Sequence, residues 1–131
     1  MKLQPDRIEG VNAIAACDPG RLRIVRQPKG SPPVALTFDA SVVVPWQGDV
    51  QPWHCDDFDA LTAEHFERIA ALGPELVIFG SGTRLRFVHP SLLRDLIERR
   101  IGVETMDTPA ACRTYNVLVA EGRSVVAALL L

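Results

Sequence analysis

The carboxyl-terminal segment of the chain, residues 75–131, alternates apolar runs with helix-like stretches, and this alternation constrains the fold more than any other feature. The run at 76–79 is continuously apolar, as expected for a strand buried on both faces. Two successive strand–helix–strand units predict parallel strands with right-handed crossovers, and the apolar last strand is expected near the centre of the sheet. In chain order the segment predicts a strand at 76–79, a helix from Pro90 to Gly102, a strand at 103–106, a helix from Thr108 to Gly122 and a strand at 124–131.

Local signals define the two helices of this segment. Proline suits a first helical turn because it lacks the N–H that would be unpaired there. Thr108 followed by Pro109 predicts a hydroxyl cap and then a helix start, and Gly122 predicts the end of the same helix. The apolar residues expected to face the core are Leu92, Leu93, Leu96 and Ile97 in the first helix, and Ala111, Tyr115, Leu118 and Val119 in the second.

The amino-terminal half predicts antiparallel strands. Turn residues at 18–20 separate two strand-like runs, 11–16 and 21–26, which is a hairpin signal. Further strands are expected at 34–38 and 42–44, and a helix is expected at 61–72 with Phe66, Ile69 and Ala70 on its buried face. The sequence therefore predicts one domain, 1–131, of the α/β (or α+β) class, in which a mixed β-sheet carries an amino-terminal hairpin portion and a carboxyl-terminal βαβαβ unit.

Composition excludes several classes of protein. The net charge of −2 gives the chain no strong field for nucleic acid, and no apolar run approaches the ~18 residues needed to span a membrane. The first ten residues lack the apolar stretch of a signal peptide. Three widely spaced cysteines without a C-x-x-C pair argue against a disulfide framework or a structural zinc site, so we expect a reducing compartment, the cytoplasm.

Polar residues gather where strands give way to helices, and they outline a candidate pocket for an anionic ligand. Glycines after a strand let backbone N–H groups approach a phosphate or carboxylate. A third glycine at dinucleotide-fold spacing and a Walker lysine are both missing, so a nucleotide loop is disfavoured. The alternative is that these residues form turns, cap helices and brace the chain. The candidates are Gly80, Ser81, Gly82, Thr83, Thr105, Asp107, Thr108, Arg113 and Asn116.

Three weaker patterns contain residues that could carry chemistry. A triad of Ser81, His89 and Asp107 can be written down, but it lacks the G-x-S-x-G pattern of a nucleophile elbow. The run at 54–57, His-Cys-Asp-Asp, is rich in metal ligands, yet no second cluster completes four ligands, so we expect no metal and no cofactor. Cys112 lies one turn inside a helix, where a thiol pKa can fall, although a buried inert cysteine is favoured.

The combined motifs resemble those of the Mth938-like proteins, also called the DUF498 family. The resemblance is strong from residue 75 onward and looser before it. No single motif would identify the family, but together they are specific. They comprise Pro45-Trp46, Gly80-Ser81-Gly82-Thr83, Gly102-Val103-Glu104, the positions Met106, Thr108, Ala111, Thr114, Tyr115 and Asn116, then Glu121, Arg123 and the apolar run 125–130.

The resemblance implies a compact single-domain α/β fold with a mixed sheet, and it carries no established enzymatic activity. A mitochondrial member of the family acts in the assembly of respiratory complex I through protein partners, and another animal member is linked to fat-cell differentiation. We therefore expect a non-enzymatic binding or assembly-factor-like module with a protein partner, presenting an apolar surface around Trp46 and Trp53. The alternative is a small-anion or small-molecule binding protein, or an unrecognised enzyme, that uses the pocket described above. A homo-oligomer is possible but not indicated.

Overall fold

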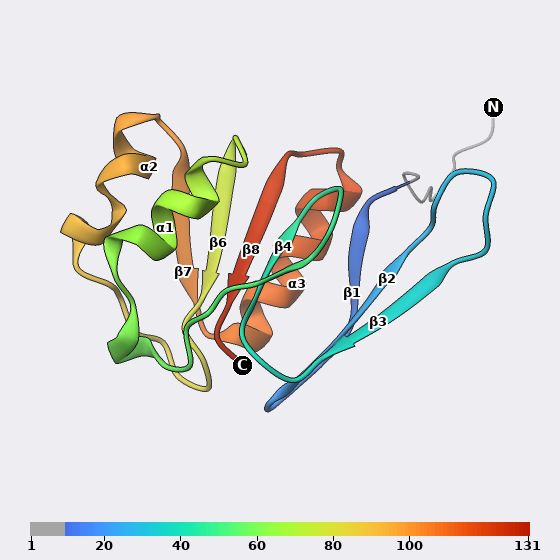
Figure 1. Ribbon diagram of the computed structural model, residues 1–131, viewed down its shortest axis with the longest axis horizontal. Coiled ribbons are helices and arrows are strands. Elements are labelled where there is room, and N and C mark those ends of the chain that lie inside the picture. Colours follow the sequence, from blue (N-terminus) through green and yellow to red (C-terminus); the bar gives the residue numbers. More distant parts are fainter. Residues whose placement is uncertain (1–9) are drawn as a thin grey trace.

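The computed structural model describes residues 10–131. The chain forms two β-sheets and packs helices against them (Figure 1). The strands are β1 Asn12–Asp18, β2 Arg21–Arg26, β3 Val34–Phe38, β4 Val42–Pro45, β5 Gln51–Pro52, β6 Leu76–Gly80, β7 Gly102–Met106 and β8 Val125–Leu129. The helices are α1 Ala63–Ala70, α2 Arg94–Glu98 and α3 Thr108–Ala120, with short 3₁₀ turns at Phe58–Ala60 and Pro90–Leu93.

The larger sheet has five strands in the order β5-β4-β8-β6-β7. Strand β6 runs parallel to both β7 and β8, and β4 joins the other side of β8 in the antiparallel sense. All five residues of β8 are buried. The parallel pairing and the central place of the last strand are both confirmed.

The smaller sheet has three antiparallel strands in the order β1-β2-β3. The hairpin around 18–20 is confirmed, with Asp18 paired to Arg21. The predicted α/β class and mixed sheet are confirmed, but the amino-terminal hairpin strands form a sheet of their own instead of joining the mixed one. Alternating apolar residues indicate which face of a strand is buried but not which sheet the strand joins.

Helices cover both faces of the larger sheet. Helices α1 and α2 lie on one face and α3 on the other, and the three-stranded sheet packs beside α3 (Figure 1). Side chains of β8 alternate between the two cores. Val126 and Ala128 face α1, whereas Val125, Ala127 and Leu129 face α3. The sheet is therefore buried on both sides, as its apolar strands predict.

The helix predicted from Pro90 differs most from expectation. It forms as a 3₁₀ turn followed by the five-residue α2, and of the predicted stripe only Leu96 is fully buried. Ile97 is 58% exposed. A 3₁₀ turn has three residues per turn instead of 3.6, so the helical spacing used to predict the stripe does not continue through it.

Smaller differences concern helix starts. Helix α1 is shorter than the predicted 61–72, although Phe66, Ile69 and Ala70 are buried as expected. The cap of α3 is Asp107, whose side chain accepts from the Ala110 N–H, so Thr108 is not the cap. Its hydroxyl instead bonds to Gly82 and Leu130.

One buried polar cluster ties the two sheets together. The Tyr115 hydroxyl of α3 lies 2.8 Å from the Asn12 carbonyl of β1 and 3.1 Å from the Pro45 carbonyl of β4. The Asn12 side-chain amide donates to the same Pro45 carbonyl at 2.8 Å. Both side chains are fully buried, and burial raises the pKa of the Tyr115 phenol. The Asn12 amide oxygen has no partner, but the other bonds join β1, β4 and α3 at particular atoms, so this cluster specifies how the sheets meet.

Replacing Tyr115 with Phe should lower the free energy of unfolding by about 1–3 kcal/mol, because the hydroxyl is lost while buried carbonyls remain without its proton. Urea unfolding measures this change. Val117→Ala is the control, since Val117 is on the same helix but 58% exposed, and it should change stability by less than about 0.5 kcal/mol. Equal stabilities of the two variants would contradict the role assigned to the hydroxyl.

Candidate functional site

The end of β6 and the start of α3 lie in direct contact at the sheet edge. The Gly82 N–H donates to the Thr108 hydroxyl at 2.8 Å, and the Thr108 N–H donates to the Gly82 carbonyl at 2.8 Å. The Thr108 hydroxyl in turn donates to the Leu130 carbonyl at 2.6 Å. Thr108 thus joins three segments, which confirms that the two predicted joints share one edge of the sheet.

Gly80 is required by this close approach. A Cβ atom on Gly80 would lie 2.9 Å from the Thr108 hydroxyl oxygen and 3.1 Å from the Thr108 Cα. Real Cβ atoms do not come so near to other atoms, so a side chain here would push the helix away from the strand. The glycine serves helix packing rather than an approaching ligand.

Ser81 shapes the loop that follows β6. It is fully buried, and its hydroxyl lies 2.7 Å from the Arg84 carbonyl and 3.1 Å from the Met106 carbonyl. The same oxygen accepts from the Arg86 N–H at 3.1 Å. A serine held in this way closes a turn and is not free to act as a nucleophile.

The other members of the predicted triad are also used locally. Asp107 caps α3, and the Nδ1 atom of His89 accepts from the Ser91 N–H at 3.1 Å at the 3₁₀ turn after Pro90. Ser81, His89 and Asp107 therefore each make a structural hydrogen bond of their own. Ser81 and Asp107 directly follow strands, as expected, whereas His89 precedes the 3₁₀ turn, and the bonds described here are to backbone groups.

Asn116 braces α3 against the three-stranded sheet. Its side-chain amide donates to the Ile14 carbonyl at 2.7 Å and accepts from the Ile14 N–H at 2.8 Å. These two bonds complete the outer edge of β1 as a neighbouring strand would. Asn116 thus has a structural use for both ends of its amide.

The predicted pocket residues are divided between two hollows. Gly82, Thr83 and Thr108 border a space of about 40 Å³ beside the β1–β2 turn. Arg113 and Asn116 border a separate open hollow of about 270 Å³ between β1 and α3. The remaining predicted member, Thr105, is half-buried in β7. The structure brings the glycine loop and Thr108 together but does not place Arg113 in the same hollow.

Neither tryptophan forms the expected exposed patch. Trp53 is 1% exposed, and its ring meets Phe66 and Phe79 edge to face, with centroids 5.6 and 5.9 Å apart. Trp46 is half-buried between the two cores. The predicted partner surface at Trp53 is therefore wrong, because the indole is buried in a cluster of aromatic side chains and is not available to a partner.

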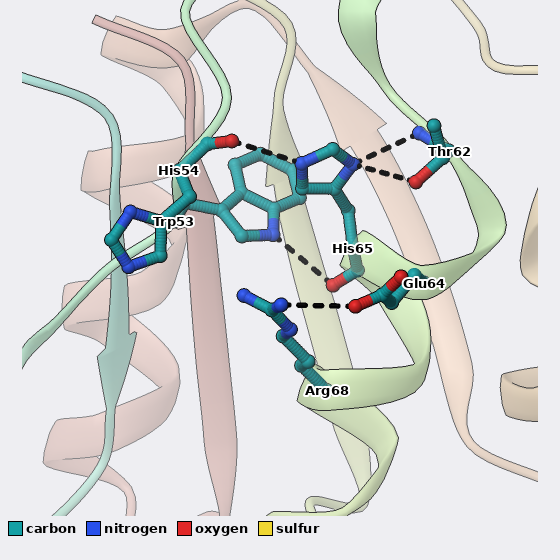
Figure 2. A network of polar contacts seen from close by, with 6 residues as sticks. All are labelled: Trp53, His54, Thr62, Glu64, His65 and Arg68. Carbon is teal, nitrogen blue, oxygen red and sulfur yellow. Dashed lines mark hydrogen bonds and ion pairs between the residues drawn. The ribbon is translucent and has the colours of Figure 1, made fainter.

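A histidine that the sequence did not single out holds Trp53 in place (Figure 2). His65 Nδ1 accepts from the Thr62 N–H at 3.0 Å, so its proton lies on Nε2, which donates to the His54 carbonyl at 3.0 Å. The Trp53 indole N–H donates to the His65 carbonyl at 3.1 Å. His54 has a φ of +59°, a strained conformation that this network fixes. The spacing Thr62-x-x-His65 resembles a capping box and was the available signal.

The cluster at 54–57 does not converge on an ion. The Cys55 thiol donates to the Asp57 carbonyl at 3.1 Å, and Asp57 accepts from the Ala60 N–H. Burial raises the pKa of the Cys55 thiol. Within residues 10–131, no three His, Cys, Asp or Glu side chains are grouped closely enough to hold a metal.

A family model described as "Protein of unknown function (DUF498/DUF598)" matches residues 14–130. The chain belongs to this family. A crystal structure of a Bordetella parapertussis protein covers 95% of this chain and 98% of its own, at 33% identity and a TM-score of 0.81. The solution structure of a Mth938-like domain from Bordetella pertussis covers 99% and 92%, at 29% identity and a TM-score of 0.79.

A curated relative carries a functional name. "NADH dehydrogenase [ubiquinone] 1 alpha subcomplex assembly factor 3" from Bos taurus is 40% identical over 83 residues, covering 62% of this DUF498 chain and 45% of the relative. The chain thus spans less than half the length of that relative. Across residues 10–131 of this DUF498 protein, the helices are all too short or too polar to cross a membrane.

Thr108→Val in this DUF498 chain should lower the free energy of unfolding by about 2–3 kcal/mol, because Gly82 and Leu130 lose their shared hydroxyl while the side-chain shape is kept. Thr108→Ser should retain most of the stability. Thr83→Val is the matched control in the exposed loop and should change stability by less than about 0.5 kcal/mol. Urea unfolding gives all three values, and a Thr108→Val protein as stable as Thr83→Val would refute the contact.

Proposed function

We propose that this chain is a non-enzymatic binding module that acts on a protein partner in the manner of an assembly factor. The resemblance to the Bos taurus assembly factor supports this proposal, since 40% identity extends over 83 residues of the common domain. The use of Ser81, Thr108 and Asn116 in internal hydrogen bonds also supports it. These three side chains brace the fold, so they are not free to serve as catalytic groups.

The observation that carries the proposal is an exposed apolar loop after β6. Residues 84–87, called here the 84–87 loop, present Leu85 at 52% exposure and Phe87 at 70%. Large apolar side chains on a surface are typical of sites that bind other proteins. Phenylalanine and leucine are also apolar enough to anchor an interface once water is excluded.

The same loop is held in shape from beneath. The Ser81 hydroxyl contacts the Arg84 carbonyl and the Arg86 N–H, and the Arg86 guanidinium lies 4.4 Å from the centre of the Phe58 ring. The loop therefore exposes Phe87 from a fixed base rather than from a free chain. A preformed loop loses less conformational entropy on binding, which increases affinity.

We further propose that the module lies in the cytoplasm. Its partner there is a protein and not a nucleic acid. Three free cysteines support a reducing compartment, and the net charge of −2 supports a protein partner. The partner's identity is a separate question, because the comparison covers only 45% of the assembly factor.

The test is co-purification of tagged full-length protein from its native cells. The wild type and Val117→Asp should recover one partner in stoichiometric amount, and Phe87→Asp should recover at least about tenfold less of it, as expected for an interface anchor. Val117 is the matched control because it is 58% exposed but lies on α3. Melting temperatures must agree between the two variants, so that loss of binding is not loss of fold.

Two results would overturn the proposal. One is recovery of the same partner at unchanged yield by Phe87→Asp. The other is the absence of any stoichiometric partner from wild-type preparations at expression levels matched to the native protein. An equal loss of partner recovery in Phe87→Asp and Val117→Asp would show that the effect is not specific to the 84–87 loop, and it would also count against that loop as the binding surface.

A further inference from the structure

Strand β1 contains one residue more than its pairing with β2 can accommodate. The register shifts between Ile14 and Ala16, so Ala15 is the extra residue of a β-bulge. Ala15 and Ala16 are both exposed, which breaks the alternation of buried and half-buried residues seen from Asn12 to Ile14. Bulges are often found next to functional sites, where they turn a side chain in a new direction.

The side chain that this bulge turns is Cys17. In a regular strand Cys17 would lie on the face opposite Ile14, because successive side chains alternate. With the bulge, Cys17 pairs with Leu22, a fully buried residue of the core around α3. Cys17 therefore lies on the inner face of the sheet, half-buried against that core.

The residue facing Cys17 across this core is Cys112 of α3. Cys112 is 3% exposed, and burial raises the pKa of its thiol. The neighbouring Cys17 thiol raises that pKa further. Both cysteines border the open hollow of about 270 Å³ between β1 and α3, together with Pro109 and Arg113. A small reagent entering this hollow reaches both thiols.

We propose that Cys17 and Cys112 are a redox pair that a hydroperoxide oxidises to a reversible disulfide, linking the three-stranded sheet to α3. The third cysteine, Cys55, belongs to the core on the opposite face of the larger sheet. It donates to the Asp57 carbonyl and takes no part. The proposal concerns modification of the chain and stands independently of the partner-binding function.

The reaction balances in two steps. Cys17, the more exposed thiol, loses its proton to solvent, and its sulfur attacks the peroxide. The O–O bond breaks, the departing oxygen takes up a proton to leave as water or an alcohol, and Cys17 becomes a sulfenic acid. The Cys112 sulfur then attacks the Cys17 sulfur, the S–O bond breaks, and the hydroxide leaves as water with the Cys112 proton. Two thiols have lost two electrons, and the hydroperoxide has gained them.

The structure assigns a different role to each sulfur. The half-buried position of Cys17 gives it access to the reagent, whereas Cys112 is 3% exposed and burial raises the pKa of its thiol. The buried thiol is thereby protected from direct oxidation and acts as the resolving partner. A disulfide between positions 17 and 112 would close most of the chain into one loop, which stabilises the folded state by restricting the unfolded chain.

The experiment treats reduced full-length protein with hydrogen peroxide, alkylates the remaining thiols, and maps tryptic peptides by mass spectrometry. The peptide ending at Arg21 should appear linked to the peptide ending at Arg113. The intact mass should fall by two hydrogen atoms, and the melting temperature should rise by roughly 5 °C or more. Dithiothreitol should reverse both changes. Cys55→Ser should behave as the wild type, and Cys17→Ser should form no cross-link.

The wild-type measurement tests the proposal without any variant, so its outcome does not depend on whether a cysteine substitution impairs folding. Oxidation of Cys17 only to sulfinic or sulfonic acid would overturn the proposal. So would a disulfide between two chains, a linkage to Cys55, or equal alkylation of Cys112 in unfolded protein before and after peroxide. A cross-linked Cys17–Cys112 peptide that dithiothreitol releases would support it.

Discussion

Helix α3 is the element on which both sheets depend. One side of it packs on the parallel strands β6 and β8, and another packs on β1 of the smaller sheet. Apolar contact alone would let two sheets slide, since it has no direction. The Tyr115 hydroxyl and the Asn116 amide supply direction, because each bonds to a particular carbonyl or N–H of β1 or β4.

Much of the fold could be predicted from local signals. The apolar runs, the proline at 109 and Gly122 define strands and helices within a few residues of where they occur. The division into two sheets could not be predicted, because it depends on whether β3 or β8 is the neighbour of β4. That choice follows from contacts between residues almost ninety positions apart, such as Val42 with Leu129.

The candidate site could be predicted in place but not in purpose. Strand-end residues such as Ser81 and Thr108 do meet at one edge, as parallel strands require. Their use follows from how closely α3 approaches β6, which Gly80 permits and no spacing in the sequence reports. The partner surface predicted at Trp53 was wrong for a related reason: the bond from the Trp53 indole N–H to the His65 carbonyl, which helps to hold the ring in the core, is reported by no spacing in the sequence.

The bulge in β1 shows why pairing carries information that periodicity lacks. Counting by twos from Ile14 places Cys17 on the outer face, and three scattered cysteines then look inert. One unpaired residue, Ala15, reverses that assignment and brings a thiol of the small sheet against the helix that joins both sheets. A Cys17–Cys112 bond would therefore join the smaller sheet covalently to α3, the helix that packs on strands of both sheets.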